Sequence, residues 1–226
     1  MKPAPSERLP NLVIPLFLGL LPSEVESVLA QGRVLEVAPK TRLCTEGDTA
    51  EHLFVVLRGR VKYSRLTAKG DELILRLFTP GETFGLATLL PNPLSYLGTA
   101  EAHFGGVLHV WHHDEISPLS DRYHQIKTNA LSIALRLMET LSDRHASLFE
   151  GNASFRVARA LLDVGRRSGE IHPEGIDVHI TNEQLGSLAD VSRFTASRVL
   201  SDWNRAGVVT KERETVRIHS PESLLS

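Results

Sequence analysis

The sequence predicts an α+β fold, in which an N-terminal antiparallel β jelly-roll barrel is followed by a long dimerisation helix and a C-terminal winged helix-turn-helix. Short apolar runs separated by glycine turns between residues 33 and 113 predict the barrel. Apolar residues at helical spacing over about 116–149 predict the long helix, and two short helical patterns joined by a tight turn over 181–207 predict the helix-turn-helix. We therefore expect three parts, covering residues 1–120, 121–150 and 151–226.

Composition and charge fit a globular protein of two domains. The chain has 226 residues, 42% of them hydrophobic, and a formal net charge of −2. Lysine and arginine number 15 in residues 1–150 and 10 in residues 151–226, against 17 and 10 aspartates and glutamates. Because neither part is strongly basic, binding of nucleic acid would depend on locally placed arginines and on the doubling of contacts in a dimer. The arginines expected to serve are Arg156, Arg159, Arg166, Arg167, Arg193 and Arg198.

Two further features limit the class of protein. Cys44 is the single cysteine, which excludes a disulfide, a thiolate-held iron–sulfur cluster or a zinc finger within one chain and fits a reducing cytoplasm. The apolar run 12–21 contains Pro15 and has about half the length needed to cross a bilayer. The residue order of a signal peptide is not completed after it. We interpret this run as a helix that enters a core, and we expect no contact with a membrane.

The N-terminal part is predicted to contain one helix and then several strands. The amphipathic pattern of residues 23–32 indicates a helix. Turn signals at 46–48, 69–71 and 80–81 separate the apolar runs that follow. The β-rich segments are 33–43, 52–66, 71–81 and 98–113.

Two apolar lines can be drawn along the predicted long helix. A helix that packs only on its own domain needs one apolar stripe, so a second stripe favours packing against a partner copy. The alternative is a helix buried within one large domain. The first line consists of Ile126, Ala130, Ile133 and Leu137, and the second of Leu131, Ala134, Met138, Leu141 and Leu148. We expect the dimer interface at Ile126, Ala130, Ile133, Leu137 and Leu141.

The helix-turn-helix prediction depends on two capping residues. Thr181 with Gln184 three residues later forms a capping box, and Ser192 caps the second helix after a turn at 189–191. The second helix presents Val199, Leu200 and Trp203 inward and ends near Gly207. A break at 151–152, which we interpret as a possible hinge, precedes a helix over 155–167, and a β-hairpin wing is expected over 208–219.

The opposite face of the second helix carries side chains suited to DNA. Arginine can donate two hydrogen bonds to one guanine, and hydroxyl groups with first-turn N–H groups can hold phosphate. The alternative is an ordinary helical hairpin with a solvated basic face. The candidate DNA-binding residues are Thr181, Ser192, Arg193, Phe194, Thr195, Ser197, Arg198, Lys211 and Arg213.

The order of barrel, long helix and winged helix-turn-helix resembles the CRP/FNR family of bacterial transcription regulators. The segments TEGDTAEHLFVVLRGRVKYS, PGETFG and ITNEQLGSLADVSRFTASRVLSDWNRAGVV carry the resemblance, together with FLGLLPSEVESVLA near the start. The resemblance implies a cytoplasmic homodimer that binds pseudo-palindromic double-stranded DNA, and RNA polymerase as a further partner. It implies no enzymatic activity.

The chain departs from the family pattern where cyclic nucleotides bind. In nucleotide-binding members, PG-x-x-FG is followed by Glu for the ribose and later by Arg-Ser for the phosphate. Here these positions hold Leu86 and Tyr96-Leu97, so control by cyclic AMP is not expected. An apolar or vestigial pocket is expected instead, lined by Phe84, Gly85, Leu86, Tyr96, Leu97 and Leu141.

Haem is the alternative ligand that ten histidines leave open, with His109 and His113 on one face of a strand. We interpret these histidines as polar surface and predict no cofactor and no metal. An alternative of another class, a cupin-like barrel enzyme, would need an H-x-H motif with a spaced Glu and His, which the barrel segment lacks. A protein of this fold that has lost DNA binding is a third alternative.

The recognition helix also departs from the family pattern. Phe194 replaces a Glu that accepts a hydrogen bond from cytosine N4 in many members, and Glu214 stands where a wing lysine often meets phosphate. Because phenylalanine has no acceptor but can touch a thymine methyl group, we expect altered base preference.

Overall fold

The computed structural model describes residues 12–68 and 70–224. Contacts divide the chain into two units, Met1–Met138 and Glu139–Ser226. The boundary between these units lies inside helix α3, Gln125–Glu150, whereas the sequence predicts a part of its own over 121–150. The last turns of α3 therefore belong with the C-terminal domain. Within the described residues, no helix is both long and apolar enough to cross a membrane.

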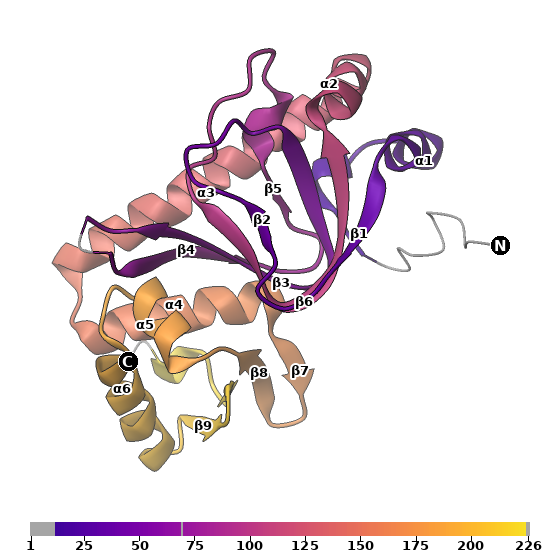
Figure 1. Ribbon diagram of the computed structural model, residues 1–226. Helices are drawn as coiled ribbons and strands as arrows, with labels where there is room; N and C mark the ends of the chain where they lie inside the picture. The colour runs from indigo at the N-terminus through magenta and orange to yellow at the C-terminus, as the bar shows by residue number, and fades with distance from the viewer. Residues whose placement is uncertain (1–11, 69, 225–226) are drawn as a thin grey trace. The chain divides into compact units, whose positions relative to one another are not determined.

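The first unit is an antiparallel β-barrel flanked by short helices (Figure 1). Pro22 begins α1 (Pro22–Gln31), and the Leu21 N–H donates to Glu24 Oε2 at 2.8 Å, which stabilises its first turn. The other helical segments are η2 (Pro15–Phe17), η3 (Leu86–Leu89) and α2 (His113–Arg122). The strands are β1 (Arg33–Val37), β2 (Arg42–Cys44), β3 (His52–Leu66), β4 (Glu72–Phe78), β5 (Thr83–Phe84) and β6 (Thr99–His112).

The apolar run 12–21 enters the core, but the α-helix expected there is wrong. Leu16 and Phe17 are buried, yet the segment forms only the short turn η2. Gly19 has a φ of 82°, and this left-handed conformation interrupts any continuous helix before α1 begins.

Alternation along the central strands of the barrel separates two cores. β3 and β6 pair along most of their length, and the sheet runs in the order β1-β6-β3-β4, with β2 on β6 and β5 on β3. Phe54 and Val56 face a core inside the barrel, whereas Leu53 and Val55 face a second core that α1, α2 and α3 cover. The predicted antiparallel barrel is confirmed, although the segment 33–43 forms two strands and β5 lies outside the predicted segments.

The helical region expected over 116–149 is two helices. α2 ends before Tyr123, whose backbone φ of −109° and ψ of 77° lie outside the helical region, and α3 begins at Gln125. Ile126 and Ala130 are buried in the helix-covered core of the barrel, and Ile133 packs against the same core. The assignment of Ile126 and Ala130 to a dimer interface is therefore wrong, because the chain itself covers both side chains.

The outer face of α3 carries the second apolar line. Leu131, Met138, Leu141 and Leu148 are all exposed, and so is Leu135 beside them. We call this face the outer row. It consists of Leu131, Ala134, Met138, Leu141, His145 and Leu148.

The second unit is a helical core with a small antiparallel sheet in the order β7-β8-β10-β9. Leu161 from α4, Leu185 from α5 and Leu200 from α6 meet in one buried cluster. The hairpin of β7 and β8 was not foreseen, because both strands are short and only Val178 among their residues is fully covered. The elements are α4 (Ala153–Ser168), β7 (Glu170–His172), β8 (Gly175–His179), α5 (Asn182–Leu188), α6 (Arg193–Arg205), β9 (Val209–Glu212), β10 (Thr215–Ile218) and η4 (Glu222–Leu224).

Candidate nucleic-acid interface

The first helix of the helix-turn-helix is capped as the sequence predicted. The Gln184 N–H donates to Thr181 Oγ1 at 3.1 Å, and the Thr181 N–H donates to Gln184 Oε1 at 3.0 Å. A Cβ at Gly186 would lie 3.0 Å from the carbonyl oxygen of Val191, so glycine permits the close approach of α5 to the turn. Thr181 is therefore fixed at the start of α5.

The second helix, α6, begins at the predicted cap. Ser192 Oγ accepts from the Thr195 N–H at 3.0 Å, and the two hydroxyl groups are 2.9 Å apart. Val199 and Leu200 are buried, and Trp203 packs against the same core. This packing fixes which side of α6 faces outward.

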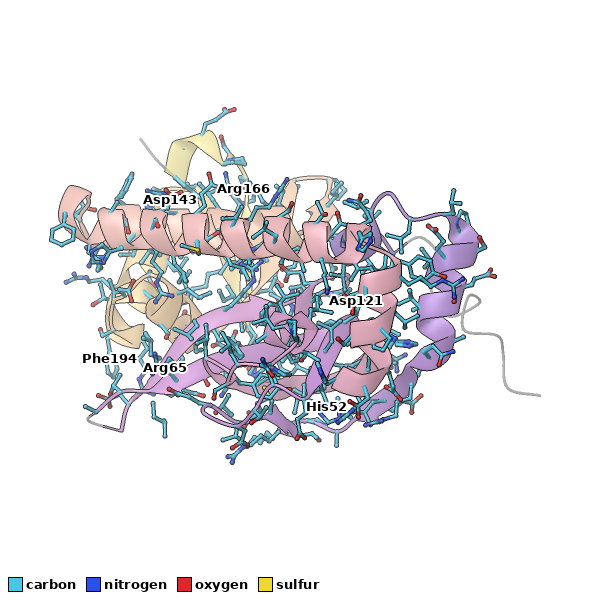
Figure 2. The ribbon with its side chains drawn as sticks, turned by 90° about the horizontal axis from the view of Figure 1, so that it is seen from above. His52, Arg65, Asp121, Asp143, Arg166 and Phe194 are labelled. Atoms are coloured by element: carbon cyan, nitrogen blue, oxygen red, sulfur yellow. The ribbon has the colours of Figure 1, made fainter. Side chains whose placement is uncertain are left out.

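The outward side of α6 carries the predicted DNA-reading residues. Arg193, Phe194 and Arg198 are exposed, and Thr195 and Ser197 are half-buried. The Arg193 guanidinium carbon lies 4.7 Å from the centre of the Phe194 ring. Phe194 is 70% exposed, and its position is labelled in Figure 2. Cationic, aromatic and hydroxyl groups thus lie together on the N-terminal half of the helix that would enter a major groove.

The wing forms as expected, but its two cations differ in position. Lys211 Nζ donates to Ser197 Oγ at 3.1 Å, so this side chain lies against α6. Arg213 is exposed in the hairpin turn, followed by Glu214 with a φ of 59°. Lys211 therefore lies beside α6, and Arg213 lies at the tip of the wing.

Several arginines expected to hold DNA are engaged within the unit. Arg156 Nε donates to the carbonyl of Ala189 at 3.1 Å, and Arg159 lies 3.2 Å from Asp143. Arg167 Nη2 forms an ion pair of 2.6 Å with Asp163. The charges of Arg159 and Arg167 are therefore partly neutralised, and Arg156 is held by backbone. Arg166, Arg193, Arg198 and Arg213 are exposed.

The residues expected to line an effector pocket do not gather in one place. Phe84 and Tyr96 belong to the inner core of the barrel, whereas Leu86 packs against the helix-covered core. Leu97 is 75% exposed, and Leu141 belongs to the other unit. Within the barrel the set is thus divided between two cores and the exposed surface, and the effector pocket stays a prediction.

Aromatic rings occupy the inner core of the barrel. The rings of Phe54 and Phe84 stack at 4.6 Å, and Phe78 lies 5.1 Å from Phe84. Tyr96 Oη donates to the His52 carbonyl and accepts from the His52 N–H, both at 3.0 Å. Burial raises the pKa of Tyr96 to about 12. Beside them, a Cβ at Gly85 would lie 2.3 Å from the His52 carbonyl oxygen, so the backbone here is closely packed.

The interpretation of His109 as polar surface is wrong. His109 is buried against Trp111, its Nε2 lies 3.1 Å from the carbonyl oxygen of Leu29, and Trp111 Nε1–H donates to the Val28 carbonyl at 2.8 Å. These bonds satisfy carbonyl groups at the C-terminal end of α1. Burial lowers the pKa of His109 to about 4.

His113 does not share a strand face with His109. It begins α2, and its Nδ1 lies 2.7 Å from the carbonyl oxygen of Thr88. Among the described residues, no group of three or more histidine, cysteine, aspartate or glutamate side chains is arranged to hold a metal ion.

Comparison with known proteins agrees with this architecture. Residues 34–122 match the cyclic nucleotide-binding domain, and residues 155–226 match the Crp-like helix-turn-helix domain. The Cyclic AMP receptor protein of Thermus thermophilus is 31% identical over 205 residues, covering 90% of this chain and 92% of that protein. The CRP-like cAMP-activated global transcriptional regulator of Mycobacterium tuberculosis is 25% identical over 218 residues, covering 92% and 94%.

A solved structure shares the fold. FixK2 from Bradyrhizobium japonicum aligns with a TM-score of 0.75 at 19% identity, over 85% of this chain and 95% of that chain. A barrel followed by a winged helix-turn-helix with an exposed recognition face defines the class of DNA-binding regulators. The chain belongs to the CRP/FNR family of transcription regulators, and this family does not consist of enzymes.

Proposed function

We propose that the protein acts as a homodimer that reads two half-sites of a pseudo-palindromic DNA site. The observation that carries this proposal is the exposed group of Arg193, Phe194 and Arg198 on the N-terminal half of α6, supported by the caps at Thr181 and Ser192. In a two-fold symmetric dimer the two recognition helices would enter successive major grooves, with half-site centres about 34 Å apart. RNA polymerase as partner and a cytoplasmic location complete the proposal.

The outer row of α3 supports the dimer. Leu131, Met138 and His145 repeat every seven residues, and so do Ala134, Leu141 and Leu148. This is the a and d pattern of a two-stranded coiled coil, and its leucines and methionine are exposed in the single chain. A second copy of the same helix would bury them. Leu141 therefore stays in the proposed interface, with Leu137 half-buried beside it.

Control by cyclic AMP is not part of the proposal. The ribose position of the family holds Leu86, whose side chain packs in the helix-covered core. The phosphate position holds Tyr96, bound to the His52 backbone, and the exposed Leu97. A phosphate in an apolar site without a cation carries a large desolvation cost, so these residues do not fit a cyclic nucleotide held in the family manner.

Selection of bound sequences from random double-stranded DNA tests the proposed function. We expect a two-fold related consensus with half-sites one helical turn apart, obtained equally with and without small molecules of a cell extract if no effector is needed. A double variant with Arg193→Ala and Arg198→Ala is the control, because it should no longer enrich this consensus if α6 reads the DNA. Enrichment of no sequence by the wild-type protein would refute the proposal.

A further inference from the structure

An arginine of α3 holds the turn of the helix-turn-helix. Arg144 Nε donates to one oxygen of the Asp190 carboxylate and Nη2 to the other, each at 2.7 Å. Nη2 also donates to the carbonyl oxygen of Ser187 at 2.5 Å. The Arg144 side chain is only 17% exposed, so these charge-assisted bonds are largely shielded from water. One guanidinium therefore contacts both the end of α5 and the turn after it.

The turn that Arg144 holds has a demanding backbone conformation. Asp190 has a φ of 52°, in the left-handed region that aspartate and asparagine tolerate better than most residues. Arg156 from α4 holds the neighbouring carbonyl of Ala189, and its Nη1 donates to the carbonyl of Gly151 at 3.0 Å. Two arginines, from the end of α3 and the start of α4, thus bind two carbonyl groups and one carboxylate of the segment 187–190.

The same bonds bear on the expected hinge at 151–152. The Gly151 carbonyl is bound by Arg156, and the Asn152 side chain caps α4 by accepting from the Phe155 N–H at 3.0 Å. The unit that contains the helix-turn-helix starts at Glu139, within α3. The end of α3 and the helix-turn-helix therefore belong to one compact unit. Hydrogen bonds hold the backbone at 151–152, where the sequence suggested a hinge.

We propose that Arg144 is a positioning residue, and that the Arg144–Asp190 pair fixes the recognition helix α6 relative to the C-terminal turns of α3. This inference rests on the proposed binding of a homodimer to paired half-sites. Because α3 carries the outer row, fixing α6 to α3 in each subunit determines the distance between the two recognition helices. A protein with this pair intact pays little ordering cost on a site of the correct spacing and resists sites of other spacings.

Removal of Arg144 should separate half-site affinity from spacing preference, two properties that a general loss of structure would change together. The caps at Thr181 and Ser192 and the core around Leu200 do not involve Arg144. Contacts of one recognition helix with one half-site should therefore survive removal of Arg144. Discrimination between spacings should not survive it.

The test measures binding to one half-site, to the selected paired site, and to paired sites with one or two base pairs inserted or deleted. We expect Arg144→Ala to bind the correct paired site about tenfold more weakly and to lose most of the preference for its spacing, with half-site binding changed less than about twofold. Asp190→Asn keeps the side-chain shape and the tolerance for positive φ, and should give the same profile to a smaller extent. The double variant should be no weaker than Arg144→Ala, because both changes remove one interaction.

Asp143→Ala is the matched control. It removes the neighbouring ion pair with Arg159, which joins α3 to α4 without contacting the turn, and should leave the spacing preference intact. Circular dichroism would show whether Arg144→Ala unfolds the protein. If it does, Asp190→Asn alone tests whether the pair determines the spacing preference. A wild-type spacing profile in the folded variants, or an equal loss on the single half-site, would overturn the inference. Failure of the wild-type protein to bind any paired site is a different result and counts against the proposed function.

Discussion

The two units of the molecule differ in how the side chains at their candidate binding positions are held. In the barrel, the positions at which family members bind a cyclic nucleotide hold Leu86, packed in a core, and Tyr96, bound to backbone. In the C-terminal unit, Arg193 and Arg198 project from α6 with their heads exposed. The first two side chains are held by contacts within the barrel, and the other two project outward. This difference supports our proposal that the chain binds DNA without the help of a cyclic nucleotide.

The largest effect is expected from changes in the proposed dimer interface on α3, which should weaken both dimerisation and DNA binding. Replacement of Met138 and Leu141 by aspartate places four charges in the proposed coiled coil and should give a folded monomer. Binding to a paired site should weaken about 100-fold or more, because the second half-site is no longer bound within one molecule. Light scattering and fluorescence anisotropy measure the two effects.

Ser132→Asp is the control for this experiment, since Ser132 is exposed on α3 but lies outside the outer row. It should leave the dimer intact. A wild-type protein that is monomeric at micromolar concentration would contradict the proposed interface.

The next effect concerns only the stability of the barrel and its dependence on pH. The pKa of His109 is about 4 in the folded protein, below the value of 6.5 for a free histidine, so the unfolded chain binds the additional proton between these pH values. The stabilisation of the fold that comes from neutral His109 is complete above about pH 6.5 and is lost as the pH falls towards 4. This loss lowers the free energy of unfolding by at most about 3 kcal/mol. Denaturant titrations of the wild type and His109→Gln at pH 7 and pH 5 measure the difference.

The glutamine variant retains a donor for the Leu29 carbonyl but does not titrate. Its stability should therefore fall less between the two pH values than that of the wild type. Equal losses in both proteins would show that His109 is not the responsible group.

A smaller effect is expected at the exposed surface of the second unit. Arg198→Ala should cost about 1–3 kcal/mol in binding and relax the preference at one base pair of each half-site. Thr195→Ala, which removes a phosphate-side hydroxyl, should weaken all sequences alike. Anisotropy titrations with single-base variants of the selected site distinguish these patterns, and uniform weakening by Arg198→Ala would remove its assignment to a base.

The smallest and most specific effect is expected at Phe194. The exposed ring can contact a thymine methyl group but offers no acceptor to cytosine N4, so the wild type should accept thymine at one position. Phe194→Glu should shift that position towards a C·G pair. Sequence selection with both proteins checks this, and identical consensus sequences would show that Phe194 does not face the groove.

The sequence predicted local features well where capping and periodicity determine them. Thr181 and Ser192 begin the two helices because their side chains bond to backbone within three residues, an arrangement visible in the sequence itself. The inward face of α6 follows from helical spacing for the same reason. The two apolar lines of α3 were also visible, although only the fold shows that Ile126 and Ala130 belong to the barrel core.

Features that depend on distant residues could not be predicted in this way. Arg144 and Asp190 are 46 residues apart, and no local pattern connects them. His109 is buried because a strand of the barrel passes beneath the end of α1, which its neighbours in sequence do not reveal. The different packing of Phe84 and Leu86, which are neighbours in the chain but belong to different cores, was hidden for a related reason.

The affinity of the purified protein for its selected paired site, measured by fluorescence anisotropy with and without cyclic AMP, tests the central contrast between the two units most directly. The account predicts specific binding with a Kd of about 10⁻⁸ M or below at physiological salt, changed less than about twofold by cyclic AMP at millimolar concentration. A tenfold or greater gain in affinity on addition of the nucleotide would contradict it, because the barrel would then hold a phosphate despite Leu86, Tyr96 and Leu97.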